Sequence, residues 1–393
     1  MLDDFFSILA GQWQAAGLFV LVALSCVVAA ALVQSGYHWL LYCSLFRYDR
    51  RVRKGKVVFQ EERPSVSVIV CAKDEAENLE RNLPEVLSQD YPDFEVIVVD
   101  DASGDETADV LTRLSSVYDN LRVRTVPAGA KFTSSKKFAV SLGIKAAKND
   151  ILLFTDADCR PASKLWISTM VRNFTPGVRI VLGYGAYESK KGLVSYAISY
   201  DTVTIAMQYL SCAVSGMPYM GVGRNLAYRK SFFLSTKGFS SHLDLQSGDD
   251  DLFVNEYADA GNTKVEISPL SVTVSGPKST IWQWFVQKQR HLTTSVRYKP
   301  SSKAVLGCEM FSRALFYIAF VACMCTGNLI AVGIAVFLFI VRMVSHYVMV
   351  NKLSSVLGDR KFPCGLILLD IFIPFFNLAA SLAPRKGERY KWK

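Results

Sequence analysis

The sequence predicts an α/β protein with a mostly parallel, Rossmann-like sheet and with transmembrane helices at both ends of the chain. Between residues 64 and 158, short β-branched runs alternate with helix-like stretches, which is the pattern of βαβ units. The 393 residues are 51% hydrophobic with a mean hydropathy of +0.22, and the apolar excess lies near the two ends. This composition excludes a disordered, collagen-like or small disulfide-bonded protein.

The first segment, residues 1–46, is expected to be a membrane anchor. Residues 11–46 contain no Asp, Glu, Lys or Arg and exceed the length needed to cross a hydrocarbon core of about 30 Å. Acidic residues near the start and the long apolar run argue against a cleaved signal peptide. The linker 47–63 opens with six basic residues among 47–56 against one acid, so the positive-inside rule places it in the cytoplasm. We therefore expect a multi-pass protein of the plasma (inner) membrane with a cytoplasmic central domain.

The central domain is expected to span residues 64–300. Apolar, β-branched runs predict strands over 65–71, 94–99, 121–126 and 151–155, with helices over 78–88, 107–117 and 135–147 between them. A parallel layer of this kind binds ligands at the carboxyl ends of its strands. Residues 159–300 are richer in turns and are expected to carry substrate loops rather than the core of the sheet. Within them, 281–292 mixes aromatic and basic residues, which is typical of a helix in the membrane interface.

The C-terminal region, residues 301–393, is expected to return to the membrane. Two spans are predicted over about 308–327 and 329–350, and a further apolar stretch covers 362–384. If that stretch crossed fully, the basic tail 385–393 would lie outside, against the charge rule. We therefore favour a re-entrant or interfacial hairpin bent at Pro374 over a third span here.

Charge and cysteine usage exclude two further classes. The net charge of +9 sits largely beside apolar spans, where anionic lipid headgroups explain it, and no stripe of stacking aromatics interleaved with basic residues predicts nucleic-acid binding. The nine cysteines are scattered without a CxxC pair, so neither a zinc knuckle nor a disulfide framework is indicated.

Acidic residues follow two of the predicted strands. Asp156 and Asp158 end the 151–155 strand, and carboxylate oxygens are the ligands that Mg²⁺ and Mn²⁺ prefer. Asp100 and Asp101 end the 94–99 strand, where they would accept hydrogen bonds from a ribose or a base, or else cap the following turn. The chain has neither a P-loop nor a G-x-G-x-x-G motif, so Lys136 or Lys137 would neutralise a pyrophosphate together with the metal.

Six segments resemble, in order, the motif set of family 2 glycosyltransferases: 68–75, 98–103, 136–139, 156–158, 247–252 and 287–291. The resemblance implies the GT-A fold, the nucleotide-diphospho-sugar transferase form of the Rossmann-like sheet. It also implies a nucleotide-sugar donor, for which we favour a UDP-sugar, and Mg²⁺ or Mn²⁺ on Asp158 and Asp156. The residues that it assigns to the nucleotide-sugar are Ala72, Asp74, Glu75, Asp100, Asp101, Lys136, Asp156, Gln287 and Arg290.

The acidic run 249–251 corresponds to the family's general-base motif. Alignment on the following Asp-Leu makes Asp249 the base, and alignment on the preceding glycine makes it Asp250, so both remain candidates. Neighbouring acids would raise the pKa of such a carboxyl group toward neutrality. The alternative is a helix N-terminus that simply carries acidic residues.

Two further motifs concern the acceptor. Gln287 and Arg290 resemble part of the Q-x-x-R-W motif of polysaccharide synthases and ceramide glucosyltransferases, but His291 replaces the tryptophan, which puts processivity in doubt. Arg224 and Asn225 resemble polar contacts of the family's acceptor loop.

Together these residues predict a membrane-anchored inverting glycosyltransferase that acts on a lipid-linked or glycan acceptor at the cytosolic membrane face. The alternatives are a processive polysaccharide synthase subunit and a non-catalytic assembly subunit. Three spans are few for a polysaccharide channel, so a homo-oligomer or a membrane partner subunit would have to supply further helices.

Overall fold

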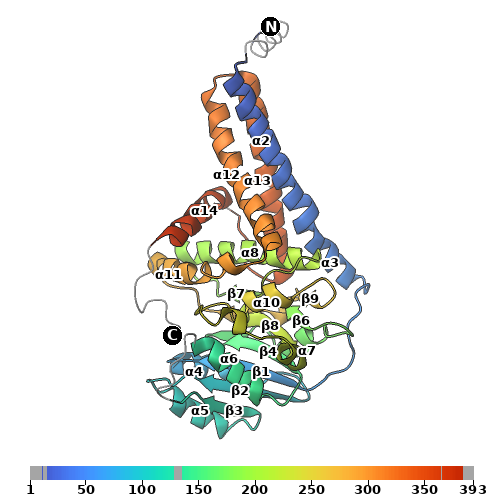
Figure 1. Cartoon of the computed structure of the whole chain (residues 1–393), viewed down its shortest axis with the longest axis vertical. Coiled ribbons are helices and arrows are strands. Elements are labelled where there is room, and N and C mark those ends of the chain that lie inside the picture. The colour runs from blue at the N-terminus through green and yellow to red at the C-terminus, as the bar shows by residue number, and fades with distance from the viewer. Residues whose placement is uncertain (1–10, 12–15, 128–134, 364, 384–393) are drawn as a thin grey trace.

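The computed structural model describes residues 11, 16–127, 135–363 and 365–383, in which three long helices rise from an α/β domain (Figure 1). The first is continuous from Leu18 to Arg53, and all three are long and apolar enough to cross a membrane. Its middle is the π-helical segment η1 between two α-helical parts. The helices are α2 (Leu18–Gly36), η1 (Tyr37–Tyr42), α3 (Cys43–Arg53), α12 (Pro300–Cys325) and α13 (Leu329–Leu357).

A seven-stranded sheet forms the centre of the domain, in the order β3-β2-β1-β4-β8-β6-β9. The four strands β3, β2, β1 and β4 are parallel, and β8 runs antiparallel to both β4 and β6. This confirms the predicted mostly parallel sheet. The strands are β1 (Val66–Ala72), β2 (Phe94–Asp100), β3 (Leu121–Thr125), β4 (Ile151–Asp156), β6 (Ile180–Leu182), β8 (Leu226–Arg229) and β9 (Thr263–Val265).

Helices cover both faces of this sheet, which explains why its central strands are apolar on successive residues. In β1, Val68 and Val70 pack in one core, whereas Ile69 and Cys71 pack in the other. The first core includes residues of α4, α5 and α7, and the second includes residues of α6 and α8. These helices are α4 (Ala76–Leu87), α5 (Thr107–Ser115), α6 (Ser135–Ala146), α7 (Trp166–Val171) and α8 (Leu193–Val214).

The segment 159–300 contributes more to the sheet than the sequence led us to expect. Its strands β6, β8 and β9 complete the central sheet, so the expectation that this half carries loops rather than sheet core was wrong. These strands have only three or four residues, too few to show a periodicity. The same segment, 159–300, also forms a second sheet, in the order β5-β10-β7. The other elements are β5 (Cys159–Pro161), β7 (Gly185–Tyr187), η2 (Gly223–Asn225), α9 (Lys230–Ser235), η3 (Ser240–His242), α10 (Asp251–Tyr257), η4 (Pro269–Ser271), β10 (Thr273–Ser275) and η5 (Ser295–Arg297).

Two helices lie at the base of the three-helix bundle, α11 (Ile281–His291) and α14 (Leu366–Leu382) (Figure 1). They pack together through Trp284 and Phe376, whose rings stack with centroids 4.2 Å apart. The expected hairpin at Pro374 is wrong, because α14 continues through this proline as one helix. With 17 residues, α14 is about 26 Å long, which is shorter than a hydrocarbon core. The predicted basic tail, residues 385–393, lies outside the described residues.

A group of buried charges ties α14 to the bundle, and we call Arg313, Arg342, Glu309 and Asp370 the bundle cluster. Arg342 donates to Asp370 over 2.6 Å and to the side-chain oxygen of Gln34, on α2, over 3.1 Å. Arg313 lies 2.6 Å from Glu309 and 3.4 Å from Asp370. The cluster therefore links α12, α13 and α14 through paired charges, and Gln34 adds α2 through a hydrogen bond.

Candidate active site

The carboxyl ends of three parallel strands meet at one edge of the central sheet. In the strand register, Ala72 at the end of β1 lies opposite Asp100 of β2, and Cys71 lies opposite Asp156 of β4. The loops that follow these strands therefore begin side by side. This places the sequence-predicted acidic residues at the edge where α/β sheets bind ligands.

Lys136 connects two of the predicted motifs. Its Nζ lies 3.1 Å from Oδ1 of Asp156 and 3.3 Å from Oδ2 of Asp249. Burial alone would lower the pKa of Lys136, but Asp156, Asp249 and Asp250 outweigh it and hold this pKa well above its usual range. Lys136 is therefore a permanent cation that joins the end of β4 to the loop before α10.

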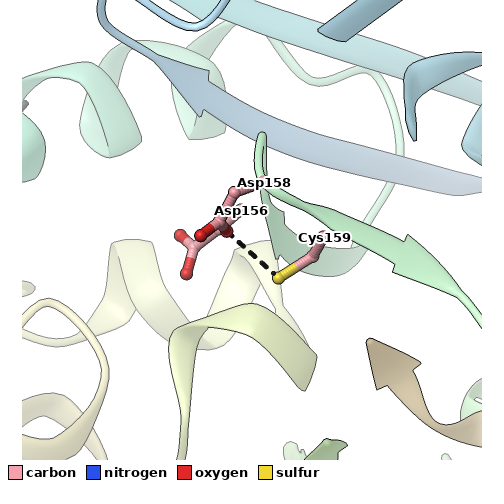
Figure 2. Close-up of side chains that lie close together, drawn as sticks. All are labelled: Asp156, Asp158 and Cys159. Atoms are coloured by element: carbon pink, nitrogen blue, oxygen red, sulfur yellow. Dashed lines mark hydrogen bonds between the residues drawn. The ribbon is translucent and has the colours of Figure 1, made fainter. Parts of the chain in front are cut away.

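Asp156 and Asp158 form the acidic pair that the sequence predicts as a metal site. Together with Cys159 they place three ligand atoms within 4.8 Å of one another, as Figure 2 shows. The Cys159 thiol donates to Oδ1 of Asp158 over 3.3 Å, and burial holds its pKa well above the usual range. Two carboxylates beside a neutral thiol fit a hard cation such as Mg²⁺ or Mn²⁺ better than a soft one.

These two carboxyl groups have opposite pKa shifts. Burial pushes the pKa of Asp156 up, but the Lys136 ammonium outweighs it and leaves this pKa below its ordinary value. Burial and then the charge of Asp156 raise the pKa of Asp158. Among the described residues, no cation forms an ion pair with Asp158. The pair therefore carries negative charge that Lys136 neutralises on one member only.

The acidic run 249–251 divides into three different environments. Asp250 accepts from the backbone N–H of Gly223 over 2.6 Å and from that of Asp251 over 2.8 Å, which caps α10. Burial, followed by the charges of Asp249 and Asp251, raises the pKa of Asp250 to about 7. Asp251 is buried and accepts from the hydroxyl groups of Thr294 and Tyr298. Asp251 therefore has a structural role, while Asp249 and Asp250 line the same small cavity as Lys136 and Asp156.

The two adjacent lysines, either of which the sequence offered for a pyrophosphate, face different partners. Lys137 is buried and donates to the backbone carbonyls of His242 and Leu245, the latter over 2.8 Å. Burial lowers its pKa to about 8. Lys137 therefore holds the loop that leads to Asp249, whereas Lys136 forms ion pairs with Asp156 and Asp249.

The β1 and β2 loops hold each other in place. Asp74 has a φ of +54° and accepts from the backbone N–H of Gly104 over 2.8 Å. Asp101 is buried and pairs with Lys73 over 3.1 Å, and its N–H donates to the carbonyl of Ala72. These contacts give the edge of the sheet a fixed shape.

Asp100 and Glu75 complete this edge. Asp100 accepts from both the backbone and the side chain of Ser103, so it caps the turn after β2, the alternative that the sequence left open. Burial raises the pKa of Glu75, and the charges of Asp158 and Asp156 add to the effect. Glu75 thus lies near the acidic pair, whereas Asp100 is used within its own turn.

The acceptor-side residues meet around Tyr187, which the sequence did not indicate. The Gln287 side chain donates to the Tyr187 hydroxyl over 3.1 Å, and the Arg224 guanidinium lies 4.3 Å from the centre of its ring. Arg290 is half-buried, and its charge contributes, after those of Lys136 and Arg224, to the lowered pKa of Asp156. The motif on α11 therefore approaches the site from the side of the three-helix bundle.

The expected acceptor contact at Asn225 is not supported by its geometry. Asn225 is fully buried, and its amide donates to the carbonyls of Tyr184 and Ser271, each over 2.7 Å. Its Oδ1 accepts from the indole N–H of Trp166 over 3.1 Å. With its amide engaged in this way, Asn225 supports the fold beneath Arg224 rather than facing a ligand.

Comparisons with known proteins match the part of the chain that forms this edge of the sheet. The family model described as Glycosyl transferase family 2 matches residues 67–232, from β1 to α9. Residues 67–232 therefore match the family 2 glycosyltransferases. The resemblance inferred from the six motifs is thus confirmed, although Asp249, Asp250, Gln287 and Arg290 lie beyond the matched residues.

Proteins of similar sequence agree with this match. The chain is 34% identical over 144 residues to glycosyltransferase AglE of Haloferax volcanii, a match that covers 36% of this chain and 45% of AglE. It is 30% identical over 117 residues to beta-monoglucosyldiacylglycerol synthase of Trichormus variabilis, covering 29% of this chain and 25% of that protein. Each match thus spans less than half of the relative.

The fold of the glycosyltransferase domain is the GT-A fold. The structure of the mannosyltransferase PcManGT from Pyrobaculum calidifontis, in complex with GDP-Man and Mn²⁺, matches with a TM-score of 0.54 at 20% sequence identity. The match covers 91% of this chain and 98% of that one, so the similarity in fold extends beyond the domain.

Proposed function

We propose that the chain is an inverting glycosyltransferase that moves a sugar from a nucleotide-diphosphate sugar to a lipid-linked or glycan acceptor at the cytosolic face of the plasma (inner) membrane. One observation carries the proposal: the Lys136 ammonium lies between Asp156 and Asp249. This contact brings the acidic pair at the end of β4 and the candidate base on the loop before α10 into one site. A transferase needs both around the sugar carbon that is attacked.

On this proposal, the donor lies across the carboxyl ends of β1, β2 and β4. Ala72, Asp74, Glu75 and Asp101 face the nucleoside, for which we favour uridine. Asp156 and Asp158 would hold Mg²⁺ or Mn²⁺, which when bound supplies positive charge for the diphosphate leaving group. Lys136 adds a second positive charge to the same group, and Arg290 approaches it from α11.

Asp250 is the better of the two candidates for the general base. Its pKa of about 7 suits a group that must take a proton from an acceptor hydroxyl at neutral pH. Asp249, in contrast, is held by the Lys136 ammonium. The backbone N–H of Gly223 fixes the direction of the Asp250 carboxylate. Direct attack by the acceptor hydroxyl in one displacement inverts the configuration at the sugar carbon.

Two features support an acceptor at the membrane surface. The helix α11, which carries Gln287 and Arg290, packs against α14 at the base of the bundle (Figure 1). Trp282 and Ile281 at the start of α11 are more than half exposed, as expected for residues at the headgroup level. A lipid-linked acceptor would then reach the site without leaving the bilayer.

The experiment that tests this function is a thermal-shift panel of the purified full chain with UDP, GDP, CDP, dTDP and ADP, each with and without Mn²⁺. Ligand binding to the folded state raises the unfolding temperature by mass action. We expect a metal-dependent shift with one diphosphate, lost in Asp158→Asn and retained in Asp119→Asn, a variant of an exposed acid near β3. The absence of a shift with all five would contradict the proposal and favour a non-catalytic assembly subunit.

A further inference from the structure

A second cavity lies beside the small sheet, where α13 ends. Its volume is about 420 Å³, within the range of small-molecule sites. The walls come from β5, from β7 and the residues after it, and from the end of α13 with the loop that follows. The polar lining residues are Arg160, Tyr187, Glu188, Ser189, Asp359 and Arg360.

The strand β5 forms a wall between this cavity and the acidic pair. Successive side chains of a strand point to opposite faces. Cys159 donates to Asp158, so the next residue, Arg160, is directed to the other face, where it lines the cavity. The two sites therefore share one short strand but not its side chains.

The lining carries as many positive as negative side chains, and it offers both hydrogen-bond donors and acceptors. Arg160 lies 3.6 Å from Glu188, and Asp359 accepts from the hydroxyl of Tyr184 and from the backbone N–H of Arg360. The Arg360 guanidinium lies 4.9 Å from the centre of the Tyr196 ring. Its Nη1 is buried and has no hydrogen-bond partner among the residues that the structure describes. Arg360 also lines the cavity, where its guanidinium group can donate to a ligand oxygen.

We propose that this cavity binds a sugar ring of the acceptor, an inference that rests on the proposed function. Two guanidinium groups and two carboxylates in one cavity favour an uncharged ligand with many hydroxyl groups, each of which both donates and accepts. A phosphate would be repelled by Glu188 and Asp359 as strongly as it is attracted by the arginines. Tyr187 adds an aromatic ring of the kind that packs against the apolar face of a sugar.

The position of the cavity suits an acceptor that is held in the membrane. It lies where α13 ends, and α13 is one of the three helices of the bundle. Tyr187 belongs to the lining and also accepts from Gln287, so the cavity adjoins the α11 motif. A glycan that enters from the bilayer would place one ring here and extend another toward Asp250 around β5, past Tyr187 and Arg224, whose neighbour Gly223 contacts Asp250.

The test uses the full chain in lipid nanodiscs and saturation-transfer NMR with methyl glucoside, methyl mannoside, cellobiose and chitobiose as probes. We expect at least one saccharide to bind both without and with the nucleotide diphosphate and Mn²⁺. Arg360→Gln should weaken this binding by about tenfold, the effect of one lost hydrogen bond to a charged group. The nucleotide shift should remain unchanged, and Arg122→Gln, on the exposed strand β3, should alter neither.

Four results would overturn the assignment: no saccharide binds, inorganic phosphate displaces the saccharide, the nucleotide diphosphate displaces it, or Arg360→Gln binds it as the wild type does. If Arg360→Gln does not fold, Ser189→Phe fills the cavity from its exposed rim without removing a charge and must abolish binding. A nucleotide shift without any saccharide signal contradicts this inference alone. The absence of both signals contradicts the proposed function as well.

Discussion

The molecule contains two groups of buried charges, and they differ in their balance of positive and negative charge. In the bundle cluster, the guanidinium groups of Arg313 and Arg342 face the two carboxylates of Glu309 and Asp370. At the edge of the central sheet, by contrast, one ammonium serves two carboxylates, and the neighbouring acids Asp158 and Asp250 have no ion-pair partner in the described part of the chain.

This difference separates a structural cluster from a ligand site. Buried charges that are balanced within the protein hold helices in one arrangement and need no further ion. Carboxylates in excess raise each other's pKa and leave the site short of positive charge, which a metal ion supplies. The following predictions test this contrast.

The largest effect is expected for Asp250→Asn. If Asp250 is the base, kcat should fall by about 10²–10⁴-fold, because the amide cannot take the proton. The metal-dependent nucleotide shift should persist, since the donor does not depend on this carboxylate. Transfer to a membrane-lipid acceptor fraction measures the first quantity, with Asp119→Asn as the matched control. Retention of full activity would move the assignment to Asp249.

Asp370→Asn should destabilise the fold without removing donor binding. The change leaves the buried Arg342 guanidinium without a carboxylate partner and Arg313 with Glu309 alone, which costs about 3–5 kcal/mol. Thermal unfolding in nanodiscs should show a clearly lower midpoint, with the nucleotide shift still present below it. An unchanged midpoint would mean that the bundle cluster is not structural.

Asp158→Asn should weaken donor binding without destabilising the fold, the opposite of Asp370→Asn. The affinity for the nucleotide with Mn²⁺ should fall by about 100-fold, because the metal loses a charged ligand. Without ligand, the unfolding midpoint should be unchanged or higher, since a carboxylate whose pKa is raised by burial and by Asp156 has been removed. A lower midpoint in the unliganded protein would contradict the contrast between the two clusters.

The smallest expected effect is a shift in the pH dependence of kcat/KM. The pKa of Asp250 is raised to about 7, so this carboxyl group is protonated and inactive at lower pH, and kcat/KM should rise with pH and level off above about 7. Burial, Asp249 and Asp251 raise this pKa, and Lys136 opposes them. Asp249→Asn removes one of the raising charges and should move the midpoint to lower pH. A midpoint that does not move would exclude Asp250 as the titrating group.

Sequence patterns predicted the strands that are long or that are followed by distinctive residues. β1, β2 and β4 are apolar runs of six or seven residues that end in or beside acids, and the family resemblance then placed Lys136 and the 249–251 run at the same edge. β6 and β9, with three residues each, gave no periodic signal. Tertiary packing brings Tyr187 and Arg360 to the second cavity, and no local sequence pattern encodes that packing.

Two details could not be read from residue type at all. Asp100 and Asp101 are identical and adjacent, but the first caps its own turn and the second pairs with Lys73. Lys136 and Lys137 differ in the same way. Neighbouring residues on a strand or helix point in different directions, so one becomes a site residue and the other a support.

The continuous first helix is longer than one membrane crossing needs. Its 36 residues span about 54 Å, well beyond a hydrocarbon core of about 30 Å. Its lower part is fastened to the domain, where Ser44 donates to the carbonyl of Ser211 and Tyr48 to that of Val265. On the proposed function, this attachment keeps the site at one fixed distance from the membrane, so an acceptor is selected by the position of its terminal hydroxyl as well as by recognition.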